Sequence, residues 1–149
     1  MTVKYFMYLE LITIPIVTIF LAQMLKLATD DYKGNFNIIN IFGRYGGMPS
    51  THATYLASLG TLLAWGYNFN SAAFALWFML TVIVLRDAMG LRQEVSRHTL
   101  AIEEIAKKTN FTIPKLTRRV GHKPIEVIAG TLFGISITII IKFILIQYI

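Results

Sequence analysis

The chain contains no cysteine, so disulfide bonds and thiol chemistry are excluded. It has only three histidines, with few carboxylates near them, and this combination fits neither a zinc site nor a two-metal centre. We therefore expect no metal and no cofactor. The apolar run at the amino terminus lacks a small-residue cleavage site, which favours an uncleaved anchor over a removable signal peptide.

Charge is also missing over a long stretch, because residues 53–85 include no Asp, Glu, Lys or Arg. As one helix this stretch would extend about 50 Å, whereas the hydrocarbon core of a bilayer is about 30 Å thick. The stretch must therefore fold back, and the polar cluster at residues 67–71 is where we expect the turn. Hydrophobic residues make up 55% of the 149 residues, and the mean hydropathy is +0.58.

These features predict an all-α integral membrane bundle. We expect a single transmembrane domain over residues 1–149, with spans at roughly 5–25, 53–67, 72–89 and 124–146. Residues 26–52 and 90–123 would then form loops on one face. The termini and the 67–71 turn would lie on the other face, where Lys142 can snorkel outward.

The basic residues predict the orientation of this bundle. Twelve of the fourteen Lys and Arg residues lie in the two long loops or at the helix ends beside them. Such an excess is typical of the cytoplasmic side of a membrane protein. We therefore predict a multi-pass protein of the cytoplasmic (plasma) membrane, with both loops in the cytoplasm.

Two further segments have a predictable role. Leu91 to Thr109 has an apolar stripe and a basic face, which predicts a cytoplasmic amphipathic helix lying at the membrane interface; residues 110–114 would end it. Gly130-x-x-x-Gly134 lies in the last span. Close packing against another helix of this chain is the favoured interpretation, and a homodimer contact is the alternative.

A polar string, Gly46-Gly47-Met48-Pro49-Ser50-Thr51-His52, precedes the second span. We expect Pro49 at the first helical position, after a turn that Gly47 permits. A helix start favours anions, so Ser50 and Thr51 could bind a phosphate while His52 transfers a proton. The alternative is that Ser50 only caps the helix and His52 is an interfacial side chain.

A second string, Gly121-His122-Lys123-Pro124-Ile125-Glu126, precedes the last span. Residues four apart share a helix face, so Glu126 could hold the imidazole of His122 in one tautomer. A histidine held in this way suits a nucleophile or a base. The alternative is that Glu126 caps the first turn of the helix. Both histidines would stand on the same face of the membrane.

Several charged residues near these strings could bind a phosphate. Arginine forms bidentate hydrogen bonds to phosphate, which makes Arg92, Arg118 and Arg119 candidates. Lys26 could reach the same pocket from the end of the first span, or could simply snorkel. Asp87 lies at the end of the third span, five residues before Arg92, and is a candidate supporting residue.

Four motifs together carry a family resemblance: Gln23-x-x-Lys26, Gly46 to His52, Asp87-Ala88-x-Gly90-Leu91-Arg92, and Gly121-His122-x-Pro124-x-Glu126-Val127. From about residue 20 to about residue 135 the chain resembles the divergent branch of the type-2 phosphatidic acid phosphatase family, which is part of the acid phosphatase and vanadium haloperoxidase superfamily.

The resemblance implies a role for each residue. His122 would be the nucleophile that forms a phosphohistidine, oriented by Glu126, and His52 would protonate the leaving alcohol. Ser50 and the backbone near Thr51 would stabilise the transferring phosphoryl group.

The chain also departs from the superfamily pattern. The Lys and Arg-Pro motif is absent, so Lys26 and Arg92 are its nearest replacements. Leu116 stands where an arginine is usual, Thr51 replaces a Gly or Ser, and Glu126 replaces an Asp.

The resemblance implies a membrane lipid phosphatase that cleaves a phosphomonoester or pyrophosphate headgroup. The expected partners are the bilayer and a phospholipid or polyprenyl phosphate, with no nucleic acid. A binder or transporter of lipid phosphates that keeps the fold without catalysis is the alternative, and a structural membrane subunit is a third.

Overall fold

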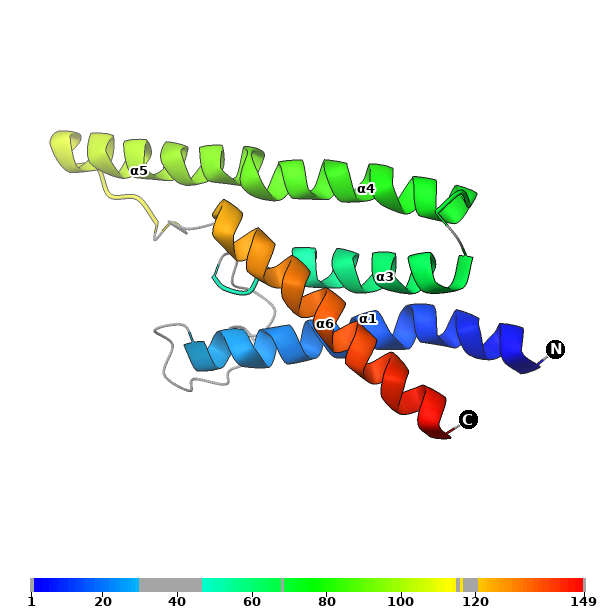
Figure 1. Cartoon of the computed structure of the whole chain (residues 1–149). Coiled ribbons are helices and arrows are strands. Elements are labelled where there is room, and N and C mark those ends of the chain that lie inside the picture. The colour runs from blue at the N-terminus through cyan, green and yellow to red at the C-terminus, as the bar shows by residue number, and fades with distance from the viewer. Residues whose placement is uncertain (1, 30–46, 68, 115, 117–120, 149) are drawn as a thin grey trace.

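Five helices make up most of the chain in a computed structural model, which describes residues 2–29, 47–67, 69–114, 116 and 121–148. They are α1 (Thr2–Thr29), α3 (Thr51–Tyr67), α4 (Ala72–Met89), α5 (Leu91–Thr109) and α6 (Pro124–Tyr148) (Figure 1). No strand occurs among the described residues. The prediction of an all-α membrane bundle with an additional amphipathic helix is therefore confirmed.

Helix α3 is the centre of the bundle, because α1, α4 and α6 all pack against it. The charge-free stretch folds back where expected: α3 ends at Tyr67, and Ser71 caps α4 by accepting a hydrogen bond from the Phe74 amide at 3.2 Å. Figure 1 shows both termini at one end of the bundle, whereas α1 ends and α3 and α6 begin at the other. The polar strings before α3 and α6 therefore lie on a common side.

Three described stretches are long and apolar enough to cross a membrane: Tyr8–Lys26, Ala72–Thr109 and Pro124–Gln147. Helix α3, with 17 residues, is shorter, so its membrane crossing stays a prediction. The outer surface of α4 fits contact with lipid, because six of its large apolar side chains are exposed: Leu76, Phe78, Met79, Leu80, Val82 and Ile83.

Small and polar side chains fill the interface between α1, α3 and α6. Ser50 directly precedes α3, and Thr54 and Ser58 lie on it; all three are fully buried. Thr138 on α6 places its hydroxyl 2.7 Å from Ser58 Oγ and 2.7 Å from the Gly134 carbonyl, so it can accept from one and donate to the other. In a bilayer, close packing and hydrogen bonds of this kind hold helices together.

The Gly130-x-x-x-Gly134 motif lies inside this interface. A Cβ on Gly130 would overlap the carbonyl of Ser50, and one on Gly134 would overlap the carbonyl of Thr54. The motif thus lets α6 approach α3 of the same chain, as the favoured interpretation holds. This glycine face is occupied and does not offer a dimer contact.

Lys142 does not snorkel outward. Its Nζ lies 2.8 Å from Glu10 Oε2 on α1, and the two side chains are only 15% and 10% exposed. The prediction was wrong because α1 and α6 are neighbours, so a carboxylate is within reach inside the bundle. A paired charge in the interior costs far less than an isolated one.

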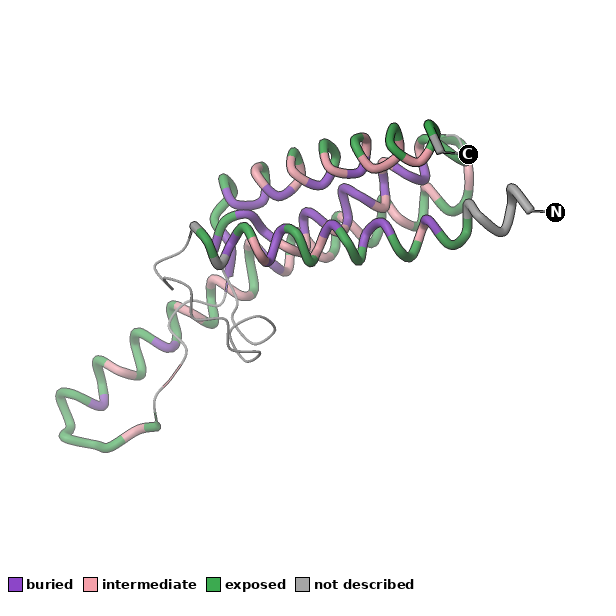
Figure 2. The backbone as a smooth tube through the Cα atoms, turned by 90° about the horizontal axis from the view of Figure 1, so that it is seen from below, coloured by how far each residue is buried: buried purple, intermediate pink, exposed green. Residues whose placement is uncertain are grey.

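Helix α5 has the predicted bounds, and Asn110 ends it in a left-handed conformation with φ of 53°. Its direction differs from the expectation for a helix lying at the interface. Helix α5 continues the course of α4 beyond Gly90 and projects from the bundle (Figures 1 and 2). Among the described helices it packs mainly against α4.

Candidate functional site

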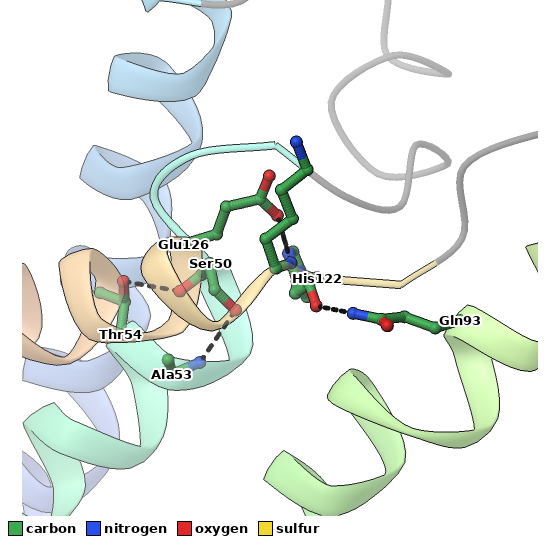
Figure 3. Close-up of polar contacts among 7 residues, drawn as sticks. Ser50, Ala53, Thr54, Gln93, His122 and Glu126 are labelled. Carbon is green, nitrogen blue, oxygen red and sulfur yellow. Dashed lines mark hydrogen bonds and ion pairs between the residues drawn. The ribbon is translucent and has the colours of Figure 1, made fainter.

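His122 and Glu126 form a buried pair at the start of α6. The ring atom Nδ1 of His122 lies 3.1 Å from Glu126 Oε2, and the two residues are 3% and 4% exposed (Figure 3). The same oxygen accepts a hydrogen bond from the Lys123 amide at 3.2 Å. Glu126 therefore makes both of the contacts that the two interpretations expect, one to the His122 ring and one to the start of the helix. One carboxylate oxygen does both.

The geometry behind this contact differs from the prediction. His122 lies two residues before the first helical residue, Pro124, so the two side chains do not share a helix face. Instead Glu126, at the third helical position, folds back over the helix start as a capping glutamate does. A carboxylate opposite Nδ1 favours the tautomer with its proton on Nδ1 and its lone pair on Nε2.

The main chain of His122 is held by a different part of the molecule. Its amide donates to the Ala88 carbonyl at 3.0 Å, and Gln93 Nε2 donates to its carbonyl at 2.7 Å. Gly121 lies so close to Gln93 that a Cβ there would come within 2.8 Å of it. Gln93 was not among the residues predicted from the sequence, where its only signal is its place directly after the motif that ends at Arg92.

His52 is the second residue of α3, and Ser50 rather than Pro49 precedes the helix. Ser50 Oγ accepts from the Ala53 amide at 3.4 Å, while the Ser50 carbonyl accepts from Thr54. The Ser50 amide in turn donates to the Glu126 carbonyl at 3.0 Å, which joins the two helix starts. This geometry supports the capping interpretation of Ser50, whose side chain is fully buried.

The two histidine rings meet across these helix starts. Their centroids are 6.1 Å apart, and the ring planes make an angle of 66°. His52 Nδ1 is buried and has no hydrogen-bond partner among the described residues. Two imidazoles at this separation can act on the same small group.

His52 lies one residue ahead of the predicted span. Because its ring is largely withdrawn from water, burial lowers the pKa of His52 below its ordinary value of 6.5. Electrostatic interactions with Arg92, His122 and Lys26 lower this pKa further. Asp87 acts in the opposite direction. The structure thus gathers these predicted residues within electrostatic range of one histidine.

Arg92 and Asp87 are in direct contact, with Nε 2.7 Å from Oδ2, and both side chains are partly exposed. Lys26 is 6% exposed, so it is buried at the end of α1. Of the other predicted residues, Gly47 has a positive φ of 94°, as expected for a turn that needs glycine, and Thr51 is the first residue of α3. Arg118 and Arg119 lie outside the described residues.

Comparison with known proteins agrees with this arrangement. A family model described as "Divergent PAP2 family" matches residues 8–137. The chain belongs to the divergent PAP2 family. It is also 29% identical over 113 residues to the "Uncharacterized membrane protein YuiD" of Bacillus subtilis (strain 168), covering 66% of this chain and 72% of that protein. No solved structure matches the chain.

Membership in the divergent PAP2 family confirms the resemblance stated above. The match covers α3, α4 and α5 completely, α1 from residue 8 and α6 up to residue 137, so all the residues described around the histidine pair lie inside it. Together with the three membrane-capable helices and a relative named as a membrane protein, it supports a location in a membrane.

Proposed function

We propose that the protein is a lipid phosphatase that cleaves a phosphomonoester or pyrophosphate headgroup through a phosphohistidine on His122. The observation that carries the proposal is the buried His122–Glu126 pair with the second imidazole, that of His52, 6.1 Å from the first. Belonging to the divergent PAP2 family supports the phosphatase chemistry.

The first step transfers the phosphoryl group. Nε2 of His122 attacks phosphorus, the bond from phosphorus to the leaving oxygen breaks, and His52 gives its proton to that oxygen. Glu126 stabilises the positive charge that develops on the His122 ring, because it faces Nδ1. Water then attacks the phosphohistidine, with His52 accepting a proton, and phosphate leaves.

We assign Lys26 and Arg92 the role of neutralising the transferring phosphate, because both act electrostatically on His52 and lower its pKa. A phosphate bound between them would oppose their effect on the pKa of His52 and favour its protonated form. Arg118 and Arg119 remain proposed phosphate ligands, and the chemistry is proposed to need no metal.

The proposal is tested by measuring phosphate release by the purified protein in detergent, in the presence of a metal chelator. The substrates are phosphatidate, phosphatidylglycerol phosphate and polyprenyl phosphates. We expect His122→Ala to lower the rate by about 10³-fold or more. His98→Ala is the matched control, since His98 is an exposed histidine on α5. A phosphoryl label that is stable in base and labile in acid should appear on the wild type. Equal phosphate release by wild type and His122→Ala would rule the mechanism out.

One observation favours a second candidate, a lipid-phosphate binder or transporter without catalysis. The Ser50 hydroxyl, a predicted phosphate ligand, is fully buried and serves the helix cap. Proteoliposomes separate the candidates, because a transporter moves lipid phosphate between leaflets without releasing phosphate.

We also propose that the histidine site faces the cytoplasm, on the strength of the basic loops. The absence of cysteine makes single-cysteine variants clean probes. In intact cells, an impermeant thiol reagent should label Asn70→Cys, in the exposed turn before α4, and should leave Thr112→Cys, beyond α5, unlabelled. The reverse labelling pattern would overturn the orientation.

A further inference from the structure

An apolar groove of about 280 Å³ lies between α4 and α6, with α3 as its floor. The floor carries four small residues about one helical turn apart: Ala53, Ala57, Gly60 and Ala64. The side walls come from Thr81 and Leu85 on α4 and from Thr131 and Ile135 on α6. Leu56 and Thr61 of α3 also line the groove, so its floor combines small residues with one leucine and one threonine.

The groove is as long as one leaflet of a bilayer is deep. Ala53 and Ala64 are eleven residues apart, which is about 16 Å along a helix. Half of a hydrocarbon core of about 30 Å is about 15 Å. At the end near the 67–71 turn stand the aromatic rings of Phe69 and Phe74, whose centroids are 5.0 Å apart. A hydrocarbon chain longer than one leaflet would have to pass these rings.

The other end of the groove adjoins the histidine site. Ala53 directly follows His52, and Leu85 lies one turn before Ala88, whose carbonyl accepts the His122 amide. A headgroup at the histidines and a hydrocarbon chain in the groove would therefore belong to one continuous molecule.

Trp77 fixes the shape of the groove at mid-length. Its indole nitrogen donates to the Leu56 carbonyl at 2.8 Å, and its ring lies on Gly60, where a Cβ would overlap it. The indole is thus held against the floor, with Phe74 packed beside it at a centroid distance of 4.9 Å. Because these contacts hold the indole in place, little ordering of the groove is needed when a chain binds.

We propose that this groove binds one acyl chain of the lipid whose phosphate reaches His122, while the rest of the lipid stays in the bilayer. The proposal rests on the proposed function and narrows its substrate class to acyl-chain phospholipids. The leaflet-long groove that ends in aromatic rings favours an acyl chain over a polyprenyl chain, which is much longer than a leaflet.

Photolabelling in proteoliposomes tests the groove without relying on hydrolysis. The probe is a phosphatidate with a diazirine at the middle of one acyl chain, and the labelled residues are mapped by mass spectrometry. We expect label on groove residues such as Thr81 and Ile135, and displacement of the label by unlabelled phosphatidate. Label spread over the outward residues Val82 and Leu132 would overturn the proposal, as would stronger displacement by a polyprenyl phosphate.

Filling the groove gives the kinetic test. Thr81→Trp and Thr131→Trp place a large side chain inside it, whereas Val82→Trp and Leu132→Trp are controls at exposed neighbouring positions. We expect the filled variants to raise KM for long-chain phosphatidate about tenfold, through the loss of buried methylene groups. Hydrolysis of a short-chain, water-soluble phosphatidate should stay within about twofold. An equal effect on both substrates, or none, would contradict the proposal.

The two proposals can fail separately. If the wild type releases no phosphate from any lipid but the probe still labels the groove, the phosphatase function fails and the acyl site stands. If phosphate is released and the label avoids the groove, the acyl site fails alone.

Discussion

The two ends of the bundle use the same helices and the same kinds of charge in different ways. Helix α1 carries Glu10 and Lys26, and α6 carries Glu126 and Lys142, each pair sixteen residues apart. Because the two helices run in opposite directions, each end of the bundle receives one acid and one base. At the end with the termini, Glu10 and Lys142 pair with each other.

At the other end of the bundle, the acidic side chain of Glu126 contacts a histidine. Glu126 faces His122 and caps α6, and Lys26 is close enough to lower the pKa of His52. The contrast teaches that burial of charge does not by itself mark a reactive site. The charges of one end neutralise each other, whereas those of the other surround two titratable rings.

Of the changes that test this comparison, we expect the largest effect from breaking the Glu10–Lys142 pair, which should lower the stability of the protein. Lys142→Met leaves Glu10 buried opposite an apolar side chain, so we expect the free energy of unfolding to fall by about 3 kcal/mol. The double variant Glu10→Leu with Lys142→Met should recover most of that loss. Unfolding in detergent, followed by helical signal, measures both. A double variant no more stable than Lys142→Met would show that the charges do not interact.

Glu126→Gln tests the acid at the histidine end. The amide oxygen can still accept from Lys123, so the cap should survive, but the negative charge opposite Nδ1 is lost. We expect kcat to fall about 10²-fold with little change in the unfolding temperature. Glu10→Gln is the matched control, with the opposite pattern: reduced stability and an unchanged rate per folded molecule. If both variants lowered kcat to a similar extent, Glu126 would have no catalytic role that Glu10 lacks.

The smallest effect concerns pH. If protonated His52 must give its proton to the leaving oxygen, kcat/KM falls as pH rises through the lowered pKa of that histidine. Arg92→Gln removes one cause of the lowering, so the fall should move to higher pH while the maximal rate drops. Rate profiles of both proteins over the same pH range measure the shift. If kcat/KM of Arg92→Gln fell at the same pH as that of the wild type, Arg92 would not influence the pKa of His52.

The same pKa shift has a consequence for stability. The unfolded chain binds a proton at His52 more readily than the folded protein does, because its pKa is the higher one. The contribution of neutral His52 to stability is therefore complete above about pH 6.5, the ordinary pKa of histidine, and is lost as pH falls through the lowered value.

Local patterns made much of this structure predictable. The charge-free stretch and its polar interruption predicted two antiparallel helices and their turn, because length and hydropathy depend on neighbouring residues alone. The four-residue spacing predicted the contact of His122 with Glu126, although a folded-back cap rather than a helix face produces it. The span count predicted that His52 and His122 would stand on the same face of the membrane.

Contacts between distant residues could not be predicted in this way. Glu10 and Lys142 are 132 positions apart, and no pattern in either helix marks them as partners. The hydrogen bond from Gln93 to His122 likewise depends on how α5 leaves α4 and on where the segment before α6 passes. Both need the packing of whole helices, which is set by close contacts such as those of Gly130 and Gly134.

The main-chain bonds of His122 connect its position to α5. Gln93 lies in the first turn of α5, while the far end of this 19-residue helix is about 24 Å away from it. A tilt of α5 about Gly90 would move Gln93 about one sixth as far as Thr109, because the two residues lie three and nineteen positions beyond Gly90. The hydrogen bond from Gln93 would pass this smaller displacement on to the His122 main chain.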